Sequence, residues 1–175
     1  MPPKVVFEYG KIIGLSNQEF LASEKRIMPT ISHLIYYQMF ADRLGWESMV
    51  KNVATVYHRL PDRDKEKAVI FASNYGEAGA IEFYGSKYNL PMVISGSGNY
   101  WLWGYGNTTG DLMISIGIDK EILSAFFEKV EDSGIIHTCN DCMNYENTLS
   151  IYICRKIKIP LKEVWRGIYS SSYQG

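Results

Sequence analysis

The chain has 175 residues, of which 46% are hydrophobic and 21% charged, and its formal net charge is -1. These values are typical of one globular domain with its own core, and they give no reason to expect a nucleic-acid partner. No apolar run approaches the ~18 residues that span a bilayer, and no signal-peptide core opens the chain, so we expect this chain by itself to be soluble.

Residues 1–30 lack a sustained hydrophobic period, and we predict an N-terminal arm or linker there. A single α/β domain is predicted over 31–169, followed by a disordered tail at 170–175. The domain opens with an N-terminal helical segment, because the hydrophobic pattern becomes helical from Ser32. Gly45 interrupts it, and hydrophobic residues then recur every three or four positions from 46 to 60. Pro61 is expected to end this helix, since proline cannot continue the hydrogen-bonding pattern.

Three nearly unbroken apolar runs, at 68–73, 91–95 and 112–118, predict strands buried in a parallel sheet. The stretch between the first two is long enough for one crossover helix, which we expect to begin near Glu77. The stretch 96–106, rich in glycine and aromatic residues, is predicted to be a loop.

Asp119 is a suitable cap for a further helix. Four hydrophobic residues of that segment are expected to face the core: Ile122, Leu123, Phe126 and Phe127. Residues 129–137 resemble a bent strand or a hairpin, residues 149–154 form another strand, and Pro160 opens a final helix. The order of these elements predicts a three-layer α/β/α domain with a mainly parallel, Rossmann-like sheet.

Polar residues follow the first two strands, where open α/β sheets bind their ligands. Asn74, Tyr75 and Glu77 follow the first strand, and Asn99 follows the second. Glu77 could act as an acid, a base or an acceptor for sugar hydroxyls, but we favour a carboxylate that stabilises the positive end of a helix. Glycosidase chemistry requires a second carboxylate about 5–10 Å away, and no obvious partner lies near in sequence.

The densest aromatic cluster of the chain lies at Tyr100, Trp101, Trp103 and Tyr105. Flat aromatic faces stack on sugar rings, so a glycan is a natural ligand, whereas the alternative is that these rings close the core at the sheet edge. The preceding glycines do not predict a dinucleotide site, because the third glycine of that fingerprint is replaced by Trp101.

Cys139 and Cys142 are separated by two residues, His137 lies just before them and Cys154 follows. These four side chains could bind zinc, but one paired motif does not establish that all four converge. Structural cysteines or a disulfide are favoured over zinc, and a redox couple is the third alternative. No cofactor is expected.

A family resemblance is carried by the stretch at 60–106, above all by the motifs NYGEAG at 74–79 and YWLWG at 100–104. It resembles the C-terminal soluble region of family 39 membrane glycosyltransferases, which are related to dolichyl-phosphate-mannose protein mannosyltransferases and aminoarabinose transferases. The segments at 41–60 and 142–165 resemble the same region.

The resemblance implies an enzyme that transfers sugar from a polyprenyl-phosphate donor, with catalytic residues in a membrane portion, so no catalytic residue is assigned here. It implies an extracytoplasmic domain whose partners are the membrane-embedded portion of the same glycosyltransferase and a glycan or polyprenyl-phosphate sugar. An oxidising compartment would favour a disulfide of Cys142 with Cys139 or Cys154.

We therefore predict a non-catalytic accessory domain that binds an acceptor or donor glycan. The candidate binding residues are Asn74, Tyr75, Glu77, Asn99, Tyr100, Trp101 and Trp103. A purely structural domain that docks on the membrane portion without a small-molecule ligand is the second hypothesis. A free-standing α/β hydrolase or transferase that uses Glu77 is the third.

Overall fold

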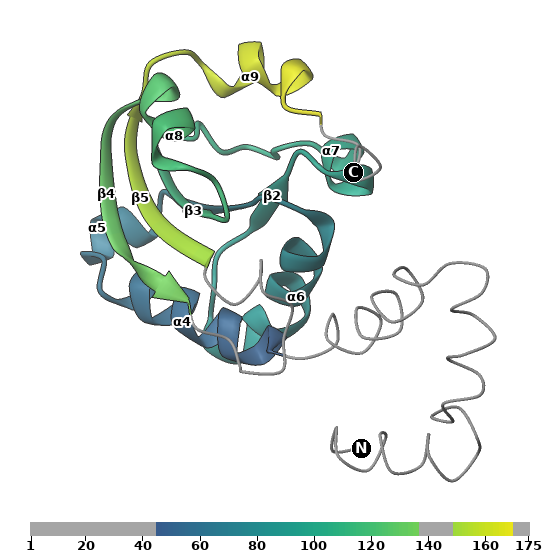
Figure 1. Cartoon of the computed structure of the whole chain (residues 1–175), viewed down its shortest axis with the longest axis vertical. Helices are drawn as coiled ribbons and strands as arrows, with labels where there is room; N and C mark the ends of the chain where they lie inside the picture. Colours follow the sequence, from purple (N-terminus) through teal and green to yellow (C-terminus); the bar gives the residue numbers. More distant parts are fainter. Residues whose placement is uncertain (1–44, 137–148, 170–175) are drawn as a thin grey trace, which may run out of the picture. The chain divides into compact units, whose positions relative to one another are not determined.

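The computed structural model describes residues 45–136 and 149–169, which form an α/β domain around a five-stranded sheet (Figure 1). The strand order is β2-β1-β3-β5-β4. Strand β1 (Ala68–Ala72) pairs in parallel with β2 (Val93–Ser95) and β3 (Leu112–Ile116). Strand β5 (Leu149–Ile157) is antiparallel to β3 and to β4 (Phe127–Ile136). The α/β class is confirmed, but the sheet is mixed rather than mainly parallel.

The antiparallel half arises where the chain turns back after β3. Helix α8 (Lys120–Phe126) ends directly against the first residue of β4, and β5 then lies between β3 and β4. Ile114 of β3 is paired with Ile153 of β5 in this register. A buried strand reads as an apolar run whichever way it points, so the hydrophobic pattern predicted these strands without their direction.

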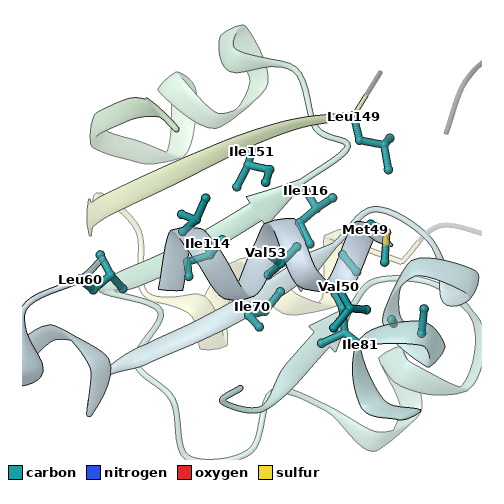
Figure 2. Packing of buried hydrophobic residues seen from close by; sticks show 14 of the residues in the cluster. Met49, Val50, Val53, Leu60, Ile70, Ile81, Ile114, Ile116, Leu149 and Ile151 are labelled. Atoms are coloured by element: carbon teal, nitrogen blue, oxygen red, sulfur yellow. The ribbon is translucent and has the colours of Figure 1, made fainter. Parts of the chain in front are cut away.

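One face of the sheet carries α4 (Trp46–His58) and α6 (Tyr75–Gly85), followed by the short 3-10 helix η1 (Ser86–Tyr88). Figure 2 shows side chains of α4 packed among isoleucines of the sheet. The helix predicted over 46–60 is confirmed, and it ends before Pro61. A one-turn helix, α5 (Asp62–Lys65), follows in the polar stretch before β1.

The other face carries α8, α9 (Leu161–Val164) and the 3-10 helix η2 (Trp165–Gly167). The final helix after Pro160 is confirmed, although it is short. Leu123 and Phe127 are buried, as expected, and Phe126 is partly buried. The prediction for Ile122 is wrong, because its side chain is 54% exposed. Two turns of helix can present only one side to the sheet, and Ile122 lies at the margin of that side.

Three further local predictions have clear outcomes. Helix α6 begins at Tyr75, slightly before the predicted start, and α7 (Gly98–Trp103) replaces the predicted loop. Strand β4 is the bent strand, with its pairing shifted between Asp132 and Gly134. Within the described ranges, no helix combines the length and the hydropathy needed to cross a bilayer. The predicted arm at 1–30, the helical pattern predicted at 32–44 and the tail at 170–175 lie outside these ranges.

Candidate functional site

The end of β1 and the start of α6 are joined by a dense set of hydrogen bonds. The Asn74 side chain accepts a hydrogen bond from the Glu77 backbone N–H at 2.9 Å, which caps the helix. In return, the Glu77 carboxylate accepts the Ser73 backbone N–H at 2.8 Å and the Ser73 hydroxyl at 2.9 Å. This reciprocal arrangement resembles a capping box and explains why the helix starts here.

Glu77 is enclosed by this arrangement, with 1% of its surface exposed. Burial raises the pKa of its carboxyl above the ordinary 4.5, although the hydrogen bonds from Ser73 oppose the shift. Gly117 at the end of β3 has φ 69°, and a Cβ there would lie 2.6 Å from the Ser73 hydroxyl and 2.9 Å from Glu77 Oε1. The carboxylate therefore occupies the space between the ends of β1 and β3 as part of the fold.

Helix α7 separates the aromatic residues that the sequence placed in one cluster. Trp101 packs against the buried side chains on the α8 and α9 face of the sheet, where its indole N–H donates to the Trp165 carbonyl at 3.0 Å. The Trp165 indole N–H donates back to the Trp101 carbonyl at 3.2 Å. Trp101 thus fastens α7 to the C-terminal helices. Tyr105 packs edge-on against Trp165 on the same side.

Tyr100 and Trp103 point the other way, toward α6. They are three residues apart, which puts them on one face of a helix. Their rings meet edge to face, with centroids 4.9 Å apart and planes at 72°. The Tyr100 hydroxyl donates a hydrogen bond to the Glu82 carboxylate. Burial and the bond to Glu82 raise the pKa of the Tyr100 phenol, so it remains a neutral donor.

These three side chains line a groove of about 450 Å³ between α6, α7 and the segment that leads into β2. Ser86, Leu90 and Met92 form part of its wall. The Trp103 side chain is 67% exposed and offers a flat apolar face at this site. The groove therefore combines aromatic surface with a carboxylate and hydroxyl groups.

Glu82 was not among the binding residues predicted from the sequence. The sequence did contain one signal for the groove: Tyr100 and Trp103 have the i, i+3 spacing of residues on one helix face. The contribution of Leu90 and Met92 had no sequence signal, since their place in the wall depends on how the chain enters β2.

The remaining candidates fall into two groups. Tyr75 is 60% exposed and Asn99 is exposed, but neither lines the groove. His137, Cys139 and Cys142 lie outside the described residues. Cys154 is free and fully buried in β5, and burial raises the pKa of its thiol to about 12. The zinc and disulfide hypotheses stay predictions. Across 45–136 and 149–169, no group of His, Cys, Asp and Glu side chains is arranged to hold a metal ion.

A second cavity, of about 250 Å³, lies on the opposite face of the sheet, between α8, α9 and η2. Phe71 and Met113 of the sheet contribute to its lining, together with Leu161 and Gly167. All of its lining side chains are apolar or absent, so it offers no group that could orient a polar ligand.

Comparison with known protein families, curated proteins and solved structures finds no match to this chain.

Proposed function

We propose that this chain is a glycan-binding accessory domain of a polyprenyl-phosphate-sugar-dependent membrane glycosyltransferase. The groove between α6 and α7 is its binding site. The observation that carries this proposal is the exposed face of Trp103 beside the hydrogen-bonded pair of Tyr100 and Glu82. The resemblance of residues 41–106 and 142–165 to the soluble region of family 39 enzymes supports the wider context.

The chemistry of the groove suits a sugar ring. One side of a pyranose presents C–H groups that pack on an aromatic face, while its edge carries hydroxyl groups that need hydrogen-bond partners. Trp103 supplies the face, and the carboxylate of Glu82 and the hydroxyl of Ser86 supply partners. A volume of about 450 Å³ falls within the usual range of small-ligand pockets.

We infer that the parallel half of the sheet is Rossmann-like, because the order β2-β1-β3 matches the start of the flavodoxin-like order. Such sheets usually bind ligands at the carboxyl ends of the strands, near the equivalents of β1 and β3. Here Ser73 and Glu77 crowd that place against Gly117. The groove at α7 is therefore the better candidate.

In this proposal the domain binds glycan and leaves catalysis to its partner, the membrane-embedded portion of the same enzyme, on the extracytoplasmic side. Asn74, Glu77 and Trp101 act in the proposal as structural residues, because each is engaged in a contact that holds the fold together. Tyr100 and Trp103, together with Glu82, carry the binding.

A titration of the full ¹⁵N-labelled chain with glucose, mannose and chitobiose, followed by NMR, tests the proposal. We expect chemical-shift changes at the Trp103 indole and at residues of the groove. Trp103→Ala should weaken binding at least about five-fold, because one aromatic stacking contact contributes roughly 1 kcal/mol.

Tyr75→Ala is the matched control, because Tyr75 is a comparably exposed aromatic residue at the start of α6 that does not line the groove. It should bind these sugars as the wild type does. Loss of binding in Tyr75→Ala with retention in Trp103→Ala would move the site to the end of β1.

Docking on another protein without a sugar ligand is the second candidate function. It is favoured by the exposed side chains of Phe83, Leu102 and Trp103 on α6 and α7, which are 75%, 70% and 67% exposed. Exposed apolar groups gathered on neighbouring elements often mark an interaction surface. Absence of shift changes with all three sugars would favour this function over glycan binding.

A further inference from the structure

We infer, on the basis of the glycan-binding function proposed above, that the groove selects its ligand by charge. It accepts neutral or ammonium-bearing sugars and rejects sugar phosphates. The groove is therefore a site for the acceptor glycan, whereas the phosphate-bearing end of a polyprenyl-phosphate sugar is bound elsewhere.

The charge of the lining carries this inference. Among the described residues that form the groove, Glu82 is the one charged side chain, and no lysine or arginine contributes. Lys87 follows the lining residue Ser86 in sequence, but its ammonium group forms an ion pair with Glu47. Phosphate sites are normally built from arginine, lysine or the backbone N–H groups of a helix start. A phosphate in this groove would instead meet a carboxylate.

The position of Glu82 is held by Tyr100. A carboxylate offers about four lone-pair positions, and the phenol O–H of Tyr100 uses one of them. The others can accept hydrogen bonds from sugar hydroxyls or from an ammonium group. The rings of Tyr100 and Trp103 present electron-rich faces, which also attract cations and repel anions. The carboxylate and the aromatic faces thus both favour cationic ligands over anionic ones.

Three ligands that share one pyranose ring separate charge from shape: glucose, glucosamine and glucose 1-phosphate. Their affinities for the full chain would be measured by NMR titration at pH 6 and low ionic strength. We expect glucosamine to bind about three- to ten-fold more tightly than glucose, as one partly exposed charge pair would produce. Glucose 1-phosphate should bind more weakly than glucose by a similar factor.

Glu82→Gln tests whether this carboxylate is the cause. It should bring the three affinities together, because the amide carries no charge while its oxygen still accepts a hydrogen bond from Tyr100. Glu163→Gln is the matched control, since Glu163 is an exposed carboxylate on α9 away from the groove. It should leave the ranking unchanged.

The outcomes distinguish this inference from the proposed function. Binding of glucose 1-phosphate as tight as that of glucose would overturn charge selection and leave glycan binding intact. Charge selection by Glu82 would also be overturned, with glycan binding intact, if Glu82→Gln kept the same order of affinities for the three ligands. If none of the three ligands shifts the resonances of the groove, glycan binding itself fails, and charge selection fails with it.

Discussion

Two adjacent residues of β3 face different kinds of packing. Ile114 points toward α4 and α6, where it is fully buried within a continuous cluster that includes Val53 and Ile70 (Figure 2). Met113 points toward α8 and α9 and borders the apolar cavity of about 250 Å³. The first face is covered by helices of 13 and 11 residues, and the second by helices of 7 and 4 residues.

The difference shows that an empty space and a binding site are distinct features. The cavity on the α8 and α9 face has apolar walls throughout, as expected where short helices cover a sheet incompletely. The groove at α6 and α7 has a carboxylate, hydroxyl groups and an exposed indole. A small number of well-placed polar groups is what orients a ligand, so the groove is the functional candidate and the cavity is a packing feature.

Alanine substitutions on the two faces should have the largest effect. We expect Ile114→Ala to lower the free energy of unfolding by about 3–4 kcal/mol, because the dense cluster cannot collapse around the lost atoms. Met113→Ala should cost about 2 kcal/mol, since part of its surface already faces empty space and fewer contacts are lost. Urea denaturation measures both values. Equal losses would show that the two faces are packed alike.

Two glycines of the α8 and α9 side offer a sharper test. A Cβ at Gly96 would lie 2.3 Å from the Ile168 carbonyl oxygen, whereas a Cβ at Gly167 would have no atom within 4 Å. Gly96→Ala should therefore lower the free energy of unfolding by about 1–3 kcal/mol. Gly167→Ala should raise it by about 0.4–1 kcal/mol, because the unfolded chain loses conformational freedom without a clash. Thermal denaturation of each variant measures these changes. If this face were uniformly packed, the two substitutions would change the stability in the same direction.

Glu77 is a buried carboxyl group on the otherwise apolar α4 and α6 face, and it should make the stability of the fold depend on pH. Because its folded pKa is raised, the folded state holds the proton more tightly than the unfolded state. Stability should fall as the pH rises from about 4.5 to the raised pKa and should not change further on account of this group. Glu77→Gln should remove this pH-dependent part of the stability and should change the free energy of unfolding by about 1 kcal/mol or less.

Denaturation midpoints measured between pH 4 and pH 8 would test this prediction. Glu77→Ala is the companion variant, because it leaves the Ser73 N–H without its acceptor and should cost about 1–3 kcal/mol at every pH. If the stability of the wild type and that of Glu77→Gln changed with pH by the same amount over this range, the raised pKa of Glu77 would be contradicted.

Much of the fold was predictable because its signals are local. The amphipathic period before Pro61 predicted α4, and unbroken apolar runs predicted β1 and β3. Helix α7 was missed because six residues that begin with a glycine are too few to form a stable helix alone. Its contacts supply the stability: Trp101 bonds to Trp165, and Tyr100 bonds to Glu82.

The candidate site was predictable only in part. Its aromatic character was visible in the sequence, and Tyr100 and Trp103 do line the groove. The sequence did not show that Trp101 faces away from them, since a loop carries no helical period. Glu77 was correctly expected to serve the start of a helix, although its enclosure between Ser73 and Gly117 depends on strands that are distant in sequence.

From sequence alone, the chain's α/β class and the ends of its main helix followed, because hydrophobic periods, proline and capping residues act over a few positions. Tertiary structure decided the direction of β5, the division of the aromatic cluster and the pairing of Glu82 with Tyr100. Each of these depends on contacts between distant residues, as the bond between Trp101 and Trp165 illustrates across 64 positions. Local patterns show which side chains will be buried, whereas only the folded chain determines which of them meet.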